Sequence, residues 1–166
     1  MTSTDYYKLN KWTVLSQYPL PLIEDIIHKF ARKEWFTSVN VQWGYNNRPI
    51  VEEDQWKATF KTKRGLFKPT VIFFRLYNFP ATFQGFMDDA FHLEIDSRDY
   101  GIYMDDILIA INGTLEEHKK VHHIFDKIQE NDLFLKLEKC TFHKREIDYL
   151  GLIIGNGKVT MDPIKV

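Results

Sequence analysis

Two adjacent carboxylates, Asp105 and Asp106, are the residues of this sequence best suited to chemistry. Apolar residues flank them on both sides, in the run Ile102-Tyr103-Met104-Asp105-Asp106-Ile107-Leu108-Ile109. This pattern predicts a tight hairpin with buried arms and a tip that presents both acids. Neighbouring carboxylates repel each other, and Mg²⁺ is the natural partner because it prefers oxygen ligands from one or two carboxylates together with phosphates. An ordinary surface turn is the alternative for this run.

Apolar periodicity predicts the elements that position the acidic hairpin. We expect helices over residues 20–32, 80–95 and 115–131, strands over 35–42, 134–137 and 149–154, and the hairpin over 100–111. Residues 36–138 then run β-α-β-β-α-β, the ferredoxin-like arrangement of an α+β fold. Because that topology sets the first strand beside the hairpin, Asn40 is expected next to Asp105 on an adjacent antiparallel strand.

The composition fits one globular domain. The chain has 166 residues, 44% of them hydrophobic, which suffices for a core. Its net charge of −1 creates no global attraction for nucleic acid, so any basic binding surface must be local. The single cysteine, Cys140, fits an intracellular protein. The first ten residues are polar and no apolar run approaches the roughly 20 residues of a membrane helix, so we expect neither a secreted nor a membrane protein.

A basic segment over residues 56–68 is the candidate surface for nucleic acid. Its alternating pattern predicts a strand with Lys57, Lys61 and Lys63 on one face and a hairpin turn at Arg64-Gly65. No acid interrupts the segment, so the lysines are suited to phosphate groups of a nucleic-acid backbone. A solvated strand face is the alternative explanation of the same pattern.

Six ordered motifs resemble the reverse transcriptase of gypsy-class LTR retrotransposons, and together they cover essentially the whole chain. Tyr103-Met104-Asp105-Asp106 is similar to the family's Y-x-D-D box. The other motifs are Tyr18-Pro19-Leu20-Pro21-Leu22-Ile23, Pro80-Ala81-Thr82-Phe83-Gln84, Leu137-Glu138-Lys139-Cys140-Thr141-Phe142, Tyr149-Leu150-Gly151 and Met161-Asp162-Pro163-Ile164-Lys165-Val166.

The resemblance implies a reverse-transcriptase palm with a ferredoxin-like βαββαβ core and part of the fingers, without a thumb. The fingers would comprise residues 1–19 and 54–80, the palm about 20–53 and 81–160, and the start of the thumb 161–166. The implied activity is RNA-directed DNA synthesis with two Mg²⁺ ions. The implied partners are an RNA/DNA template-primer, deoxynucleoside triphosphates, and the thumb and RNase H of a larger polyprotein. The implied location is a cytoplasmic particle or the nucleus.

The resemblance also implies roles for particular residues. Asp105 and Asp106 would hold metal, together with the backbone carbonyl of Val41. Tyr45 would lie under the sugar and exclude a 2′-hydroxyl, and Phe74 would line the nucleotide pocket. The primer grip would begin at Tyr149-Leu150-Gly151, so Leu150 and Gly151 would contact nucleic acid.

Departures from the family pattern fall on metal and nucleotide positions. Asn40 stands where the family has its first metal-binding Asp. The asparagine keeps a carbonyl oxygen but lacks the negative charge of the carboxylate. Tyr7 replaces an Arg that would grip the triphosphate, and Arg75 replaces a Gly beside the nucleotide pocket. Pro49 removes a backbone donor from an expected strand. We therefore expect weak or absent polymerisation.

Two other interpretations of the sequence stay open. The alternative function is a catalytically dead relic or a nucleic-acid-binding module. The third interpretation is an unrelated ferredoxin-like domain with an acidic hairpin.

Overall fold

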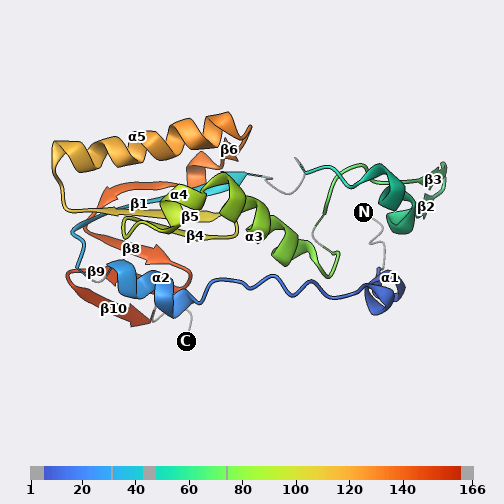
Figure 1. Cartoon of the computed structure of the whole chain (residues 1–166), viewed down its shortest axis with the longest axis horizontal. Coiled ribbons are helices and arrows are strands. Elements are labelled where there is room, and N and C mark those ends of the chain that lie inside the picture. The colour runs from blue at the N-terminus through green and yellow to red at the C-terminus, as the bar shows by residue number, and fades with distance from the viewer. Residues whose placement is uncertain (1–5, 31, 43–47, 74, 162–166) are drawn as a thin grey trace.

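The computed structural model describes residues 6–30, 32–42, 48–73 and 75–161. An antiparallel sheet forms its centre, with strands in the order β4 (Tyr100–Tyr103), β5 (Asp106–Ile111), β1 (Trp35–Gln42) and β6 (Phe134–Leu135) (Figure 1). Strand β7 (Thr141–Lys144) also pairs with β1. Helices α3 (Phe79–Ala90) and α5 (Leu115–Glu130) connect the strands in the order β1-α3-β4-β5-α5-β6. The predicted α+β fold with a ferredoxin-like core is therefore confirmed.

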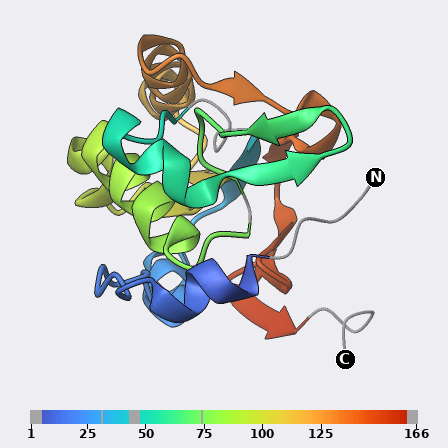
Figure 2. The same cartoon turned by 90° about the vertical axis from the view of Figure 1, so that its right-hand side faces the viewer.

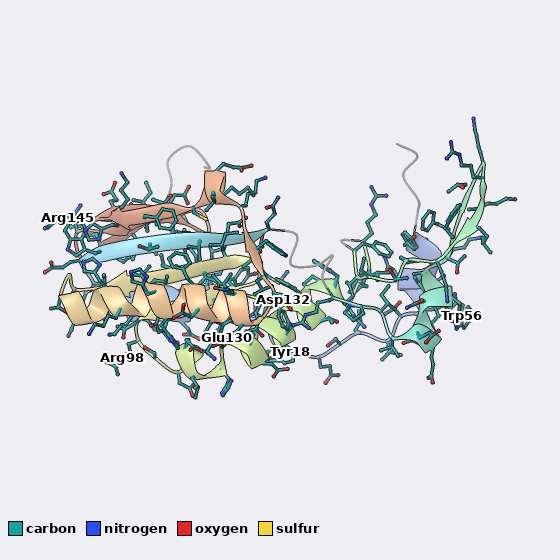
Figure 3. The ribbon with its side chains drawn as sticks, turned by 90° about the horizontal axis from the view of Figure 1, so that it is seen from above. Tyr18, Trp56, Arg98, Glu130, Asp132 and Arg145 are labelled. Atoms are coloured by element: carbon teal, nitrogen blue, oxygen red, sulfur yellow. The ribbon has the colours of Figure 1, made fainter. Side chains whose placement is uncertain are left out.

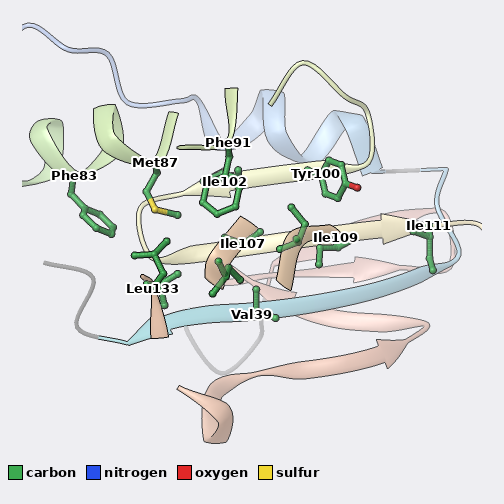
Figure 4. Packing of buried hydrophobic residues seen from close by; sticks show 13 residues of the cluster. Val39, Phe83, Met87, Phe91, Tyr100, Ile102, Ile107, Ile109, Ile111 and Leu133 are labelled. Carbon is green, nitrogen blue, oxygen red and sulfur yellow. The ribbon is translucent and has the colours of Figure 1, made fainter. Parts of the chain in front are cut away.

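Two apolar cores lie on the two faces of the sheet because neighbouring strand residues point to opposite sides. Ile107 and Ile109 of β5 belong to the core that also contains side chains of α3 and α5 (Figure 4). Leu108 and Ala110 belong to the opposite core, with side chains of α2 (Ile23–Phe30) and of strands β8 (Glu146–Tyr149) and β9 (Leu152–Gly155). The hairpin arms are thus buried on both faces, and this fixes the position of the turn between them.

A close approach of backbone and helix fixes α2 on the sheet. Gly101 of β4 lies so near to α2 that an added Cβ would stand 2.6 Å from Cγ2 of Ile26 and 2.7 Å from Cε2 of Phe30. Both distances are shorter than van der Waals contact, so only glycine permits this packing. The predicted buried stripe of helix 20–32 is confirmed by Ile26, Ile27 and Phe30, although the described helix begins at Ile23.

Four of the remaining elements lie at one end of the sheet. Helix α1 (Tyr7–Trp12), the 3-10 helix η1 (Glu52–Ala58) and the hairpin of β2 (Phe60–Thr62) and β3 (Gly65–Phe67) stand in front of the sheet in Figure 2. Short helices α4 (His92–Ile95) and η2 (Leu137–Lys139) and the last strand β10 (Lys158–Met161) complete the described elements. No helix in the described part of the chain is long and apolar enough to cross a membrane.

Several sequence predictions need correction. The predicted strand 134–137 ends at Leu135, and Leu137 begins the 3-10 helix η2. Residues 56–58 form the end of η1 instead of a strand, and the hairpin turn lies at Lys63-Arg64, since Thr62 pairs with Gly65. The predicted strand 149–154 is a hairpin whose turn is Leu150-Gly151, with both residues at positive φ (52° and 82°). The predicted helix 80–95 is divided at Phe91 into α3 and α4.

Candidate active site

The turn between β4 and β5 presents the acidic pair as predicted. Tyr103 pairs with Asp106 across the hairpin, so Met104 and Asp105 make the turn. Met104 has a φ of 55°, a left-handed conformation that is costly for a residue with a side chain. Its backbone N–H donates a hydrogen bond of 2.7 Å to Oε1 of Gln84, a buried residue of α3. The helix therefore holds the turn in a conformation that it would not favour alone.

Asn40 lies directly beside the acidic pair. It is opposite Asp106 in the ladder between β1 and β5, which confirms the predicted neighbourhood of these strands. Its side-chain Nδ2 donates hydrogen bonds to Oδ1 of Asp106 at 2.6 Å and to Oδ2 of Asp105 at 3.2 Å. Only 6% of Asn40 is exposed, so this amide is committed to the two carboxylates. The donated hydrogens partly offset the repulsion between the acids.

Buried surroundings favour the protonated form of Asp106. Burial raises the pKa of this carboxyl, and the nearby charges of Asp105 and Asp148 raise it further, whereas the hydrogen bond from Asn40 and the charge of Lys139 lower it. The net direction is upward. The hydroxyl of Tyr149 lies beneath, donating to the backbone carbonyl of Asp106 at 3.1 Å. Burial raises the pKa of Tyr149 well above its usual value, so this hydroxyl stays a donor.

A cavity of about 610 Å³ opens over these groups. The predicted metal residues Asn40, Asp105 and Asp106 line this cavity, and so do Leu150 and Gly151, which the sequence placed in the primer grip. The structure adds four residues to its wall: Ser38, Lys139, Asp148 and Tyr149.

Sequence reasoning placed Tyr149 at the start of the primer grip and assigned no role to Gln84, Lys139 or Asp148. Gln84, Lys139 and Tyr149 lie inside the quoted motifs, and the spacing of Gln84 and Asp88 (i, i+4 on one helix) was a signal for the hydrogen bond of 2.7 Å that joins them. Asp148 had no local signal, because only the fold of the β8–β9 hairpin carries it to β1.

Tyr7 and Arg75, the two expected nucleotide residues that the structure describes, do not line this cavity. Tyr7 lies on α1 and is 69% exposed. Arg75 is also exposed, and its backbone carbonyl accepts a hydrogen bond of 2.8 Å from Nδ2 of Asn10. Tyr45 and Phe74 lie outside the described residues. Val41 follows Asn40 on β1, where its N–H donates to the carbonyl of Asp105 at 2.8 Å.

The three predicted lysines do not share a strand face. Lys57 is on η1 and forms an ion pair with Asp54 of the same helix. Lys61 lies on β2 and Lys63 in the following turn, and both are exposed. The alternation in the sequence was misread here because Trp56 and Lys57 belong to a helix. The hairpin still carries two lysines and Arg64 into solvent.

Metal ligands are incomplete at the acidic pair. Among the described residues, no group of three or more His, Cys, Asp or Glu side chains could hold a metal ion. Asp105 and Asp106 are the natural oxygen ligands for a metal ion in the cavity. The neighbouring side chain of Asn40 instead donates hydrogen bonds to both carboxylates through its Nδ2. The side chains present therefore do not fit a pair of divalent cations.

Comparisons with known proteins agree with the fold. Residues 1–154 match the family "Reverse transcriptase (RNA-dependent DNA polymerase)". The Pol polyprotein of transposon 297 from Drosophila melanogaster is 33% identical over 98% of this chain, and the transposon Tf2-3 polyprotein of Schizosaccharomyces pombe is 31% identical over 91%. The chain spans only 15% and 11% of these two relatives.

Solved structures give the same architecture. The foamy viral protease-reverse transcriptase in complex with an RNA/DNA hybrid superposes with a TM-score of 0.86 over 96% of this chain and 21% of that protein, at 21% identity. The same viral protein in complex with double-stranded DNA also has a TM-score of 0.86, over 33% of its chain. At a sequence identity of 21%, this similarity shows a shared fold only.

Proposed function

The chain belongs to the reverse transcriptase (RNA-dependent DNA polymerase) family, and we propose that it forms the palm and part of the fingers of a retrotransposon polymerase whose catalysis is impaired by Asn40. In this proposal residues 1–19 and 54–80 are fingers, 20–53 and 81–160 are palm, and 161–166 begin a thumb. The ferredoxin-like core and the similarity to transposon polyproteins support the assignment. The polyprotein would act inside the cell, in a cytoplasmic particle or the nucleus.

The observation that carries the proposal is the pair of hydrogen bonds from Nδ2 of Asn40 to Asp105 and Asp106. In nucleotidyl transfer, bound Mg²⁺ supplies charge stabilisation at the transferring phosphate. A carboxylate at position 40 would add a third anionic acceptor for such ions. The amide instead points donors at the same oxygens, so it competes with a cation for their lone pairs. The site is therefore ill suited to the two-metal reaction that the family implies.

The proposed partners are an RNA/DNA template-primer and deoxynucleoside triphosphates. Tyr45 and Phe74 are the proposed contacts for the sugar and the base of the nucleotide. Tyr7 stands at the triphosphate position, but its phenol cannot provide the forked cationic contact of an arginine. Arg75 adds a bulky side chain near the same site. Nucleotide binding should consequently be weakened along with catalysis.

A rescue series in primer extension on an RNA template tests the proposal. Each variant is fused at its C-terminus to the thumb segment of an active reverse transcriptase. The parent should be near background, Asn40→Asp should gain activity, and Asn40→Asp with Tyr7→Arg and Arg75→Gly should gain more. If the missing charge costs about 4 kcal/mol in the transition state, Asn40→Asp raises the rate about a thousandfold.

Asn40→Asp combined with Asp105→Asn is the matched control, because it keeps the two carboxylates of the parent and only moves one of them to position 40. It should remain near background. Robust extension by the parent would overturn the proposed impairment.

A nucleic-acid-binding module without catalysis is the second candidate function. The exposed lysines of the β2–β3 hairpin favour it, because they could contact phosphates without any chemistry at the acidic pair. The two candidates differ in the rescue series. If the chain is a binding module, the triple variant should still fail to extend a primer, although it binds the template-primer.

A further inference from the structure

Another cavity, also of about 610 Å³, lies beside helix α2 and shares no residue with the acidic site. Its volume is in the range of pockets that hold small ligands. Four of its six wall residues are Lys or Arg, one is a histidine and one is an acid. The wall consists of Asp25, His28, Lys29, Arg32, Lys33 and Arg98. No residue for which the sequence suggested a function lines this basic cavity.

The basic cavity is remote from the hairpin that carries the predicted lysines. Arg98 of its wall lies toward one end of the molecule, whereas Trp56 of η1 lies toward the other end (Figure 3). Arg145 lies at the same end as Arg98 and lines a smaller cavity of about 220 Å³. The two cavities share Arg32 and Lys33, so their positive charges add up in one region.

Two lysines of the wall are held in place by neighbouring groups. Nζ of Lys29 donates a hydrogen bond of 2.9 Å to the backbone carbonyl of Ile95. Lys33 forms an ion pair with Asp99, and only 14% of its side chain is exposed. Because an ammonium group has three donors, each lysine can still donate to a ligand. Both side chains are therefore ordered in advance, which lowers the entropy cost of binding.

The two arginines of the wall keep their donors for a ligand. Arg32 and Arg98 are exposed, and neither guanidinium forms an ion pair or a hydrogen bond with the described residues. A cation is favourable at the C-terminal end of a helix, which accounts for Lys29 in the last turn of α2. Both arginines lie beyond that helix, which ends at Phe30. Their forked guanidinium groups match the oxygens of a phosphate.

We propose that the basic cavity binds a small anion that carries two or more phosphate groups. With His28 neutral, the wall has a net charge of +3, because Asp25 is the acid that opposes its four cations. One phosphate group carries at most about two negative charges, so a single phosphate leaves part of this charge unmatched.

A nucleic-acid strand suits this cavity less well. The described wall residues include no Phe, Tyr or Trp, the side chains on which the bases of a single strand stack. A compact polyphosphate needs only the cationic donors that are present. The inference is independent of the proposed polymerase function, because it uses neither the acidic pair nor the β2–β3 hairpin.

Isothermal titration calorimetry with sodium tripolyphosphate, in a buffer free of divalent ions, tests the site. The parent should bind one tripolyphosphate per chain. Arg98→Met and Arg32→Met should each raise the Kd about tenfold or more, because each removes charged hydrogen bonds to the phosphates. Arg98→Lys keeps the charge without the fork and should give a smaller rise. Arg64→Met is the matched control, because it removes the same charge from an exposed turn that lines neither cavity, and its Kd should equal that of the parent.

Asp25→Asn is a second variant that keeps every cation of the wall. It removes the acid that repels the anion, so the Kd should fall, and loss of folding cannot produce that result. An unchanged Kd in both folded arginine variants overturns the proposal. A rise in Arg64→Met as large as in Arg98→Met also overturns it, because binding would then follow net charge alone.

Competition against tripolyphosphate identifies the source of the phosphates. Displacement by ATP at a lower concentration than by inositol hexakisphosphate supports a nucleotide, and the reverse order supports a phosphorylated polyol. Orthophosphate that binds as tightly as tripolyphosphate overturns the requirement for several phosphates. Oligo(dT) that displaces tripolyphosphate at a lower phosphate concentration than ATP overturns the assignment to a small anion. Because no divalent ion is present, these outcomes are independent of the rescue of polymerisation.

Discussion

Gln84 and Met104 join helix α3 to the acidic hairpin through one hydrogen bond of 2.7 Å, in which the backbone N–H of Met104 donates to Oε1 of Gln84. Gln84 is fully buried, and its Nε2 donates to Oδ1 of Asp88 at 2.7 Å. The glutamine is therefore fixed at both ends of its amide. It holds the turn that places Asp105 beside Asn40.

Gln84→Met should destabilise the fold by about 1–3 kcal/mol, because at similar side-chain volume it leaves the partly buried backbone N–H of Met104 without its acceptor. Urea denaturation followed by circular dichroism measures the change as a lower midpoint at an unchanged slope. Gln129→Met, at an exposed position of α5, is the control and should change the midpoint little. Equal midpoints for Gln84→Met and the parent would show that this bond does not hold the turn.

Asn40→Asp should make folding stability depend on Mg²⁺. In EDTA the variant places a third carboxylate beside Asp105 and Asp106, and it loses the two hydrogen bonds of the amide, so its Tm should fall below that of the parent. Added Mg²⁺ should then raise its Tm, with about 2.7 kcal/mol gained when the ion is at a hundred times its Kd. Thermal denaturation with and without Mg²⁺ measures both effects. The parent should respond little, and an equal response of parent and variant would contradict the reading of the Asn40 amide.

Asp99 should make stability depend on acid pH. This carboxylate joins Lys33 and Lys120, with Nζ of Lys120 at 2.6 Å. Burial alone raises the pKa of Asp99, but the hydrogen bonds and charges of the two lysines outweigh it, so the folded-state pKa is below the ordinary 3.8. The stabilisation is therefore present above pH 3.8 and is lost as the pH falls through the folded-state pKa.

Asp99→Asn tests this assignment. It should lower the free energy of unfolding at pH 7 by about 1–3 kcal/mol, since both lysines lose a charged partner. The variant should also show a shallower loss of stability below about pH 5 than the parent. Urea denaturation at several pH values measures both effects. Parallel pH profiles would mean that another carboxylate controls the acid response.

The core and the acidic hairpin could be predicted because their signals are local. The apolar run around Asp105 and Asp106 specifies two buried arms and a turn, and the spacing of Ile26, Ile27 and Phe30 specifies one helix face. The order of elements then limits the topology to one in which Asn40 meets the hairpin. The structure has this pairing, with Asn40 opposite Asp106.

Other features depended on interactions that no local pattern contains. Apolar and basic residues alternate over 56–68, which suggested a strand. However, three acids, Glu52, Glu53 and Asp54, begin the helix η1 just before them, and the Asp54–Lys57 ion pair has the i, i+3 spacing of a helix. Leu150 and Gly151 both have a positive φ in the turn after β8. Because Leu150 is not a glycine, Gly151 was the only residue in the sequence that indicated a turn there. Asp148 and Lys139 reach the acidic cavity from segments distant in the chain, and only the completed sheet brings them there.

The corrected hairpin leads to a prediction about individual lysines in nucleic-acid binding. Lys61 and Lys63 project from the exposed β2–β3 hairpin, whereas Lys57 is paired with Asp54 on η1. Each phosphate that a lysine neutralises contributes roughly −0.9 to the slope of log affinity against log salt on duplex DNA. Lys61→Ala and Lys63→Ala should therefore each make that slope shallower by about 0.9, without changing sequence preference.

Lys57→Ala is the matched comparison for these variants. Its ammonium already has a carboxylate neighbour, and an exposed pair of this kind is worth about 0–1 kcal/mol, so removing it should alter neither the fold nor the slope by much. Anisotropy titrations of a labelled duplex over a series of salt concentrations give all slopes. If the affinity of the parent does not fall as salt rises, the hairpin lysines are only a solvated surface. If Lys57→Ala changes the slope as much as Lys61→Ala, the helix η1 also contacts the backbone, and the basic surface extends beyond the hairpin.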